Sequence, residues 1–186
     1  MTDAEPRWLS PDEERAWRAY RRMQTVLPVA LARDLALDSG LSEPDYDVLS
    51  TLSEQTGHRW QLRELADRML WSRSRLSHHL ARMETRGLVA REPDPDDGRN
   101  AVVVLTDHGF SVLRAAAPAH VESVRRHLVD LATPAELAAL AALAERVVAE
   151  VGDLAGRATA AAPGGGTAGV GGGGRRSRAG RAARGG

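Results

Sequence analysis

The chain has 186 residues, a formal net charge of zero and no cysteine. The absence of cysteine excludes disulfide frameworks, thiolate nucleophiles, cysteine zinc sites and thiol-based peroxide sensing. The N-terminus has no basic start or apolar stretch, and no segment approaches the roughly 18 apolar residues of a membrane span. We therefore expect a cytoplasmic protein without a membrane partner, with room for one full core or for a small domain joined to helical dimerisation arms.

The first predicted helix begins at a capping box. Ser10-Pro11-Asp12-Glu13 combines a hydroxyl cap, a proline at the first helical position and a glutamate that closes the box. Trp17 and Tyr20 follow at helical spacing, and the helix should bend or loosen at Pro28. We expect residues 1–40 to form an N-terminal helical arm.

A helix-turn-helix pattern follows this arm. The first short helix is capped by Ser42-Glu43-Pro44-Asp45 and runs through Leu52. The second short helix buries one face, made of Leu62, Leu65, Ala66 and Met69. After a turn at Leu70-Trp71, Ser72 caps a third helix that runs to Gly87, where glycine suits the left-handed C-terminal position. Two short helices, a tight turn and a third helix are typical of helix-turn-helix domains.

The third helix has an apolar side and a polar side. At about 100° per residue, the apolar side consists of Leu76, Leu80, Met83 and Gly87. The opposite side consists of Ser74, His78, Ala81 and Thr85, flanked by Arg75, Ser77 and Arg82. Such a face suits a DNA major groove, because small residues allow close approach while Arg, Ser and His reach base edges or phosphates. An ordinary solvated face is the alternative, although such a face usually carries more acids than the single Glu84 here.

The zero net charge hides a cationic stretch around this helix. Between residues 59 and 91 three acids oppose eight arginines, which are Arg59, Arg63, Arg68, Arg73, Arg75, Arg82, Arg86 and Arg91. This local excess of five positive charges is what phosphate binding needs, whatever the total charge. All 25 basic residues of the chain are arginine. Arginine suits bidentate contacts to phosphate and guanine, but a GC-rich genome would give the same bias.

Two short strands and a turn predict a β-hairpin after the third helix. Residues 89–92 and 101–106 have the character of strands, and the turn residues Pro93-Asp94-Pro95-Asp96-Asp97-Gly98 separate them. Near the tip, Arg99 can enter a narrow minor groove while Asp97 orients its guanidinium. A surface ion pair of little energetic value is the alternative, and the spacing does not decide between the two.

Two further helices and a tail complete the chain. Thr106 caps the first of these helices, which should kink at Pro118. Thr133-Pro134-Ala135-Glu136 is a second capping box and begins the last helix. The apolar stripe of that helix consists of Leu137, Leu140, Ala141, Ala144, Val147, Val148 and Val151. Residues 157–186 are expected to form a disordered Gly/Arg-rich tail, whose arginines can add sequence-independent affinity for phosphate.

No motif predicts a catalytic or metal site. His120 and His127 stand seven residues apart and could face the same way, but no carboxylate and histidine cluster accompanies them, so we expect solvated histidines. No nucleophile and base pair, metal-ligand set or cofactor fingerprint occurs at a spacing that would assemble a site. We therefore expect no enzymatic activity, no cofactor and no bound metal.

The stretch from Ser42 to Gly109 resembles the multiple antibiotic resistance regulator (MarR) family. The matching segments are Leu65-Ala66, Ser74-Arg75-Leu76-Ser77-His78-His79-Leu80, Met83-Glu84-Thr85-Arg86-Gly87-Leu88-Val89, Asp94-Pro95-Asp96-Asp97-Gly98-Arg99 and Val104-Leu105-Thr106. The most specific signal is the Asp-x-Arg wing followed by Leu-Thr-x-x-Gly. The cysteine of the oxidation-sensing branch of that family is absent from this chain.

The resemblance implies a mainly α fold with a small β-hairpin wing, that is, a winged helix-turn-helix with flanking dimerisation helices. It also implies a homodimeric repressor that binds double-stranded DNA at a palindromic operator. By the same resemblance, a small organic ligand, often phenolic or anionic, releases the repressor from the DNA. Carried over by position, the family's DNA contacts fall on Ser72, Arg73, Ser74, Arg75, Ser77, His78, Arg82, Asp97 and Arg99. Candidates for the ligand pocket are Trp17, Tyr20, Trp60 and His79, for which a place in the core or in a dimer interface is the alternative.

These patterns divide the chain into four parts. They are an N-terminal helical dimerisation arm (1–40), a winged helix-turn-helix DNA-binding domain (41–108), C-terminal dimerisation helices (109–156) and the tail (157–186). Two other functions stay open. A ligand-independent DNA-binding activator or architectural protein would show no release by an effector. A winged helix that has lost DNA binding and contacts proteins is disfavoured by the basic face of the third helix.

Overall fold

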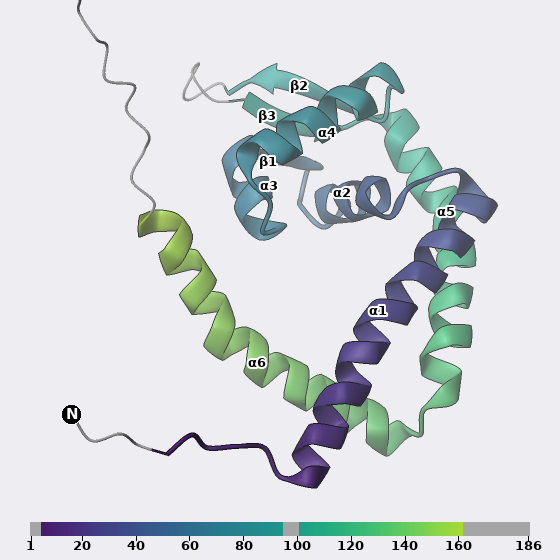
Figure 1. The fold of residues 1–186 in the computed structure, drawn as a ribbon. Coiled ribbons are helices and arrows are strands. Elements are labelled where there is room, and N and C mark those ends of the chain that lie inside the picture. Colours follow the sequence, from purple (N-terminus) through teal and green to yellow (C-terminus); the bar gives the residue numbers. More distant parts are fainter. Residues whose placement is uncertain (1–4, 95–100, 162–186) are drawn as a thin grey trace, which may run out of the picture.

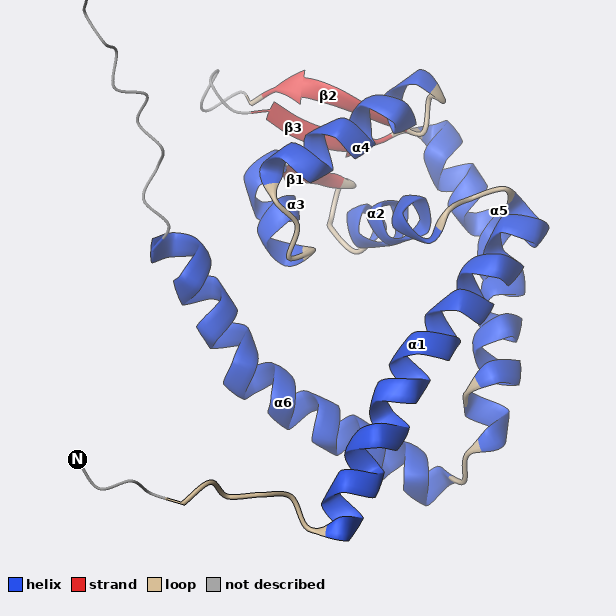
Figure 2. Cartoon of the chain, viewed as in Figure 1, coloured by secondary structure: helices blue, strands red, loops and turns tan. Residues whose placement is uncertain are grey.

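The computed structural model describes residues 5–94 and 101–161, with side chains up to Val151. It is mainly helical with one small sheet, as the sequence predicts (Figure 1 and Figure 2). In chain order the elements are α1 (Pro11–Ser39), α2 (Glu43–Ser53), β1 (Arg59–Gln61), α3 (Leu62–Arg68), α4 (Arg73–Thr85), β2 (Val89–Pro93), β3 (Ala101–Leu105), α5 (Asp107–His127), the 3-10 turn η1 (Val129–Leu131) and α6 (Pro134–Ala161).

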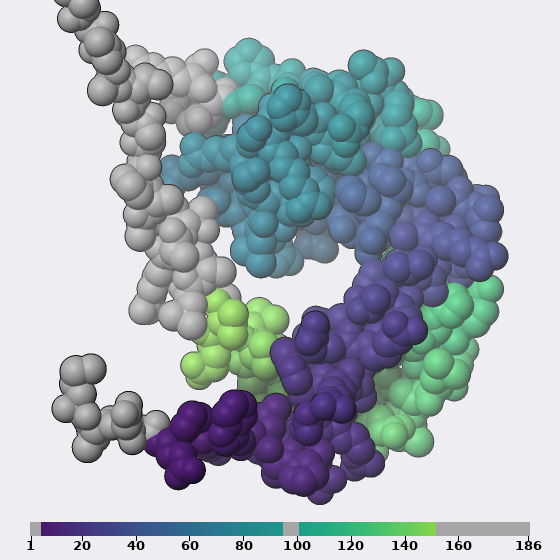
Figure 3. Space-filling model, in the orientation of Figure 1, coloured from purple at the N-terminus to yellow at the C-terminus, as the bar shows by residue number. Residues whose placement is uncertain are grey.

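The elements form a lobe and three long helices. α2, α3 and α4 pack with the sheet into the lobe, while α1 and α5 lie side by side and extend away from it (Figure 1). α6 begins at the far end of this pair, and an open space separates it from the lobe (Figure 3). The core therefore lies in the lobe and in its junction with α1 and α5.

The core confirms how α4 is oriented. Its fully buried members, each 0% exposed, are Val48, Leu49, Leu52, Leu65, Ala66, Leu76, Leu80, Met83 and Val103. Leu76, Leu80 and Met83 come from α4, so the predicted apolar side of this helix faces the interior. Gly87, which we placed on the same side, is exposed and ends the turn after α4 with a left-handed φ of 69°.

The capping boxes lie where the sequence predicts them, and both proline-containing helices continue past their prolines. The Ser10 and Thr133 side chains each accept a bond from the backbone amide of the glutamate three residues later, and that glutamate bonds back to the cap amide. Pro28 lies inside unbroken α1 and Pro118 inside unbroken α5. Each proline removes one helical hydrogen bond. Packing of α1 along α5 supplies the stabilisation that local propensity lacks.

The sheet has one strand more than the predicted hairpin. β2 and β3 pair antiparallel from Val89 opposite Leu105 to Pro93 opposite Ala101, which confirms both predicted strands. β1 pairs with the other edge of β3, so the strand order is β1-β3-β2. The sequence does not predict β1, because three residues are too few to show an alternating pattern of apolar and polar side chains.

The C-terminal helix is longer than the sequence suggests. α6 continues to Ala161, beyond the boundary at residue 157 where we expected the tail to begin, and residues 162–186 lie outside the described part. Among the described residues no single helix is long and apolar enough to cross a membrane. α5 and α6 meet the criteria of length and composition only as a pair, bent by 107°.

The Leu-Thr-x-x-Gly segment joins the sheet to α5. The Thr106 hydroxyl caps α5 by accepting a bond from the Gly109 amide, and it donates to the carbonyl oxygens of Gly87 and Leu88. Gly109 lies so close to Leu88 that a Cβ built on it would stand 2.0 Å from the Leu88 carbonyl oxygen. A backbone atom cannot move away cheaply, so this position requires glycine.

We predict that Gly109→Ala destabilises the protein by at least about 3 kcal/mol, the upper part of the usual range for overpacking. Denaturant unfolding measures the change, and exposed Ser111→Ala on the same helix is the control, with an expected effect within about 0.5 kcal/mol. Equal stability of the two variants would contradict the close approach of α5 to Leu88.

A buried carboxylate holds α2 against α4. Asp45 is 4% exposed and closes the capping box of α2, because its side chain accepts a bond from the Ser42 amide. It also accepts a 2.7 Å hydrogen bond from Arg86, and His79 Nε2 lies 3.1 Å from its Oδ1. One carboxylate therefore contacts the start of α2, the middle of α4 and the turn after α4.

Replacing Asp45 by alanine leaves the Arg86 guanidinium without its acceptor and the buried His79 without the carboxylate beside it. We predict that Asp45→Ala lowers the free energy of unfolding by about 3 kcal/mol, as expected when one partner of a buried pair is removed. Asp38→Ala, which removes an exposed carboxylate from α1, is the matched control and should cost less than about 0.5 kcal/mol. A loss for Asp45→Ala no larger than that of the control would show that the carboxylate does not hold the lobe together.

Candidate nucleic-acid interface

The predicted contact residues of α4 lie together on the surface of the lobe. Ser72, Arg73, Ser74, Arg75, His78 and Arg82 are exposed, and Ser77 is half-buried. Ser72 starts the helix, since its hydroxyl accepts a bond from the Arg75 amide. The Ser77 carbonyl oxygen accepts a bond from Arg91 of β2, which ties the helix to the sheet. No other described element covers this face, which points away from the core (Figure 1).

Ion pairing divides the eight arginines of the cationic stretch into two groups. Five of them pair with carboxylates: Arg59 with Glu92, Arg63 with Asp67, Arg68 with Glu54, Arg86 with Asp45 and Arg91 with Glu84. Within residues 5–94 and 101–151, Arg73, Arg75 and Arg82 have no carboxylate partner. All three belong to α4. The uncompensated positive charge of the stretch is therefore concentrated on the exposed face of this helix.

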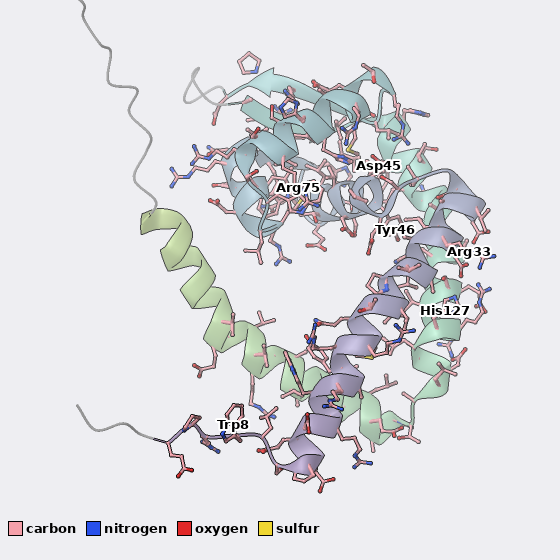
Figure 4. All side chains as sticks on the ribbon, viewed as in Figure 1. Trp8, Arg33, Asp45, Tyr46, Arg75 and His127 are labelled. Carbon is pink, nitrogen blue, oxygen red and sulfur yellow. The ribbon has the colours of Figure 1, made fainter. Side chains whose placement is uncertain are left out.

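Two of these guanidinium groups are held by aromatic rings. Arg75 lies over the ring of Trp71 at 4.1 Å from its centroid, and Arg82 donates a 3.0 Å hydrogen bond to His79 Nδ1. The Trp71 and His79 rings pack in a T-shaped arrangement, with an angle of 88° between their planes. Figure 4 labels Arg75 on α4 and Asp45 on α2 in this part of the lobe. The rings reduce the freedom of both arginines without neutralising them.

The protonation states follow from these contacts. Burial acts to raise the pKa of Asp45, but hydrogen bonds from Arg86 and Ser42 outweigh it and hold that pKa below its ordinary value. Burial lowers the pKa of His79, and Arg82 and Arg75 lower it further against the opposing effect of Asp45. A guanidinium can only donate, so His79 Nδ1 must accept and the ring proton must lie on Nε2, facing Asp45.

A surface cavity of about 270 Å³ lies along this side of α4. It is lined by Pro44, Trp71, Arg75, His78, His79 and Arg82. Sequence reasoning missed Pro44, Asp45 and Trp71 as neighbours of the predicted contacts. Trp71 precedes the helix cap and looked like part of a turn, and Asp45 looked like a capping residue alone.

The predicted wing contacts cannot be placed. Asp97 and Arg99 lie outside the described residues, so neither of their alternative roles is tested. The strands on either side of them are paired as far as Pro93 and Ala101.

The four ligand-pocket candidates do not come together. Trp17 and Tyr20 contact each other on α1 and are about half exposed, whereas Trp60 lies in β1 against the core of the lobe. His79 is buried beside Asp45 on α4. The structure places these residues at three separate locations, on α1, on β1 and on α4.

A larger cavity lies between α2, the turn after α3, and α5. Its volume is about 400 Å³, and it is lined by Tyr46, Asp47, Ser50, Thr51, Glu54, Arg68, Met69, Trp71 and His120. Burial raises the pKa of Tyr46, and it raises the pKa of Asp47 against the opposing effect of His120. Trp71 contributes to this cavity and to the one on α4.

The two histidines weighed as metal ligands have other contacts. The His120 ring packs on Tyr46 at 4.3 Å between centroids, and His127 Nε2 lies 2.9 Å from a carboxylate oxygen of Asp34. Asp34 also accepts a bond from the buried Ser123 hydroxyl, so this group joins α1 to α5. Bonds from Ser123 and His127 hold the pKa of Asp34 below its ordinary value. In the described part of the chain, no group of three or more His, Asp or Glu side chains is placed to bind a metal.

Comparison with known proteins identifies the family. The profile of the MarR family matches residues 41–101. The transcriptional regulator HosA of Escherichia coli O111:H- is 38% identical over 101 residues, which are 54% of this chain and 73% of HosA.

Two solved structures from Streptomyces coelicolor are similar over most of their length. The MarR family transcriptional regulator AbsC is 39% identical with a TM-score of 0.74, over 78% of this chain and 98% of AbsC. Sco3205, a MarR family transcriptional regulator solved in complex with DNA, is 41% identical with a TM-score of 0.74, over 80% of this chain and 92% of Sco3205. The chain therefore belongs to the MarR family of transcriptional regulators.

Proposed function

We propose that this regulator is a homodimeric repressor that places α4 in the major groove of a palindromic operator. A small organic ligand releases the repressor from this DNA. The observation that carries the DNA-binding part is the position of the three arginines without carboxylate partners. They lie on the exposed side of a helix whose other side is fixed in the core. Cationic charge with small polar residues on one accessible helix face is what groove binding requires. The DNA complex of Sco3205 supports the same use of the fold.

The proposed contacts are the residues expected from the sequence. Ser74 and His78 are exposed at the centre of this face, and we propose that they contact base edges. Arg73, Arg75 and Arg82 supply charge, and Ser72 and Ser77 border them. Asp97 and Arg99 of the wing are proposed as minor-groove contacts from their position in the sequence alone.

We predict that the purified chain binds a palindromic duplex from near its own gene, with an affinity that falls steeply as salt rises. Arg75→Ala and Arg82→Ala should each weaken binding about tenfold, because each removes a charge-assisted contact. Fluorescence anisotropy across a salt series measures both effects. Arg15→Ala removes one exposed arginine from the start of α1 and is the charge-matched control. If Arg75→Ala and Arg82→Ala bind as tightly as Arg15→Ala and the parent, the interface lies elsewhere on the protein.

The dimer proposal rests on apolar surface that a single chain leaves exposed. α6 exposes Leu140, Leu143, Val147, Val148 and Val151, and α1 with the segment before it exposes Trp8, Trp17, Val26 and Val29. α6 has no extensive packing partner among the described residues (Figure 1). Amphipathic helices of this kind need a surface to cover their apolar stripe. A second copy would supply it, with the arms 1–40 and 109–156 forming the interface and 41–108 left free for DNA.

We predict that Val148→Asp converts the dimer to a monomer, because it buries a charge in the proposed interface. Val148 is 68% exposed in the single chain, so the fold of the lobe should not change. Sedimentation measures the oligomeric state, and Ala149→Asp, which adds the same charge off the apolar stripe of the same helix, is the matched control. A parent chain that sediments as a monomer at micromolar concentration would contradict the proposal.

For the ligand we propose the 400 Å³ cavity between the lobe and α5 in place of the four residues expected from the sequence. Its position beside both a dimerisation helix and the lobe suits a regulatory site. Trp71 forms part of its wall and also carries Arg75, so a molecule that displaces Trp71 would disturb a proposed DNA contact. Screening phenolic and other organic compounds against the protein-DNA complex tests this role. The alternative, a ligand-independent activator or architectural protein, would release DNA with none of them.

A further inference from the structure

The side chains of Arg75 and Arg82 are positioned differently from those at the centre of the exposed face. Residues 75, 79, 82 and 86 follow the i, i+4, i+7, i+11 spacing of a single helical stripe. We call this stripe the α4 flank. It faces the start of α2, where Asp45 binds Arg86 and lies beside His79. The central ridge, with Ser74, His78 and Ala81, points away from the lobe. A helix in a major groove directs its central ridge at the bases and its flanks at the strands that border the groove.

Both arginines on the flank turn back along the helix. Arg82 reaches His79, three residues earlier, and Arg75 reaches Trp71, four residues earlier. Neither guanidinium extends outward from the ridge, as a base-reading arginine would. Instead, both border the 270 Å³ cavity that runs between α4 and Pro44.

We propose that the α4 flank binds the sugar-phosphate backbone of one DNA strand, with Arg75 and Arg82 on separate phosphates, and that His79 positions Arg82 without touching DNA. This inference rests on the DNA-binding function proposed above, and it assigns different contacts to different sides of α4. The flank fixes the register of the protein on the duplex, and the central ridge reads the sequence. Positions 75 and 82 are about 10 Å apart along the helix, too far for a single phosphate.

The role of His79 follows from the contacts of its two ring nitrogens. His79 is 7% exposed, so little of its ring is open to solvent beside the exposed Arg82. Asp45 faces Nε2 and leaves Nδ1 available as the acceptor for Arg82. This arrangement restrains a long side chain before binding, which reduces the entropy lost when it contacts a phosphate.

The first test separates backbone contacts from base contacts. The operator duplex is prepared with one phosphate at a time replaced by a neutral methylphosphonate, and affinity is measured for the full-length parent and for Arg82→Ala. We expect methylphosphonate replacement at one phosphate per half-site to weaken binding of the parent about tenfold. The same replacement should not weaken binding of Arg82→Ala any further. The salt slope of Arg82→Ala should fall by about two, because each of the two half-sites loses one phosphate contact. The loss of affinity should be the same for every base-substituted duplex.

Two results of this test would overturn the inference. One is an Arg82→Ala variant that is as sensitive as the parent to every methylphosphonate. The other is an Arg82→Ala variant that relaxes discrimination at one base pair, since Arg82 would then read a base. In both cases the protein still binds its operator, so the proposed function stands. Failure of the parent to bind any duplex would instead refute the proposed function.

The second test is a double-mutant cycle on His79 and Arg82. His79→Leu should weaken operator binding in the parent but not in the Arg82→Ala background, because the histidine acts through the arginine. His79→Asn keeps an acceptor at the place of Nδ1 and should restore most of the affinity. His108→Gln, an exposed histidine on α5, is the control.

Additive losses from His79→Leu and Arg82→Ala would overturn the positioning role. Thermal unfolding of each variant shows whether the lobe is intact. If His79→Leu does not fold, the comparison of His79→Asn with the parent decides, and a tenfold loss in this acceptor-preserving variant would contradict the proposal.

Discussion

The rotation of α4 about its own axis determines which residues this protein presents to a partner. Leu76, Leu80 and Met83 are completely buried, and each fully buried side chain of this size contributes about 1.5–3 kcal/mol. Turning the helix enough to hide Ser74 and His78 would bring these three side chains into water. The core of the lobe therefore keeps the polar face outside, whatever that face binds.

Asp45 extends this constraint from the core to the surface. It contacts the cap of α2, the Arg86 guanidinium and His79, and His79 in turn accepts from Arg82. A buried carboxylate is thus linked through one side chain, His79, to an exposed arginine. Ion pairing elsewhere in the cationic stretch has the complementary effect, because it neutralises five arginines and leaves the charge on α4 uncompensated.

Sequence reasoning predicted the parts of the fold that depend on local patterns. Hydroxyl caps located the starts of α1, α2, α4, α5 and α6, and the apolar spacing of α4 identified its buried side. The pairing of β2 with β3 followed from β-branched residues around a turn. These features are set by neighbours in the chain, so the chain alone reveals them.

The parts that sequence reasoning missed depend on contacts between distant residues. β1 is a strand because it pairs with the edge of β3. His79 looked like a pocket residue, yet a carboxylate 34 positions earlier in the chain determines its environment. The cavity that joins α2 to α5 was missed for the same reason, since its lining comes from three separate segments.

The central claim is that the three arginines of α4 without carboxylate partners form the DNA-binding surface. The most direct measurement is an NMR titration of the arginine Nε–H signals of the full chain with an operator duplex. We expect large shifts for Arg73, Arg75 and Arg82 and small shifts for the ion-paired Arg59, Arg63 and Arg86. Shifts confined to the ion-paired arginines, with the three α4 signals unchanged, would contradict it.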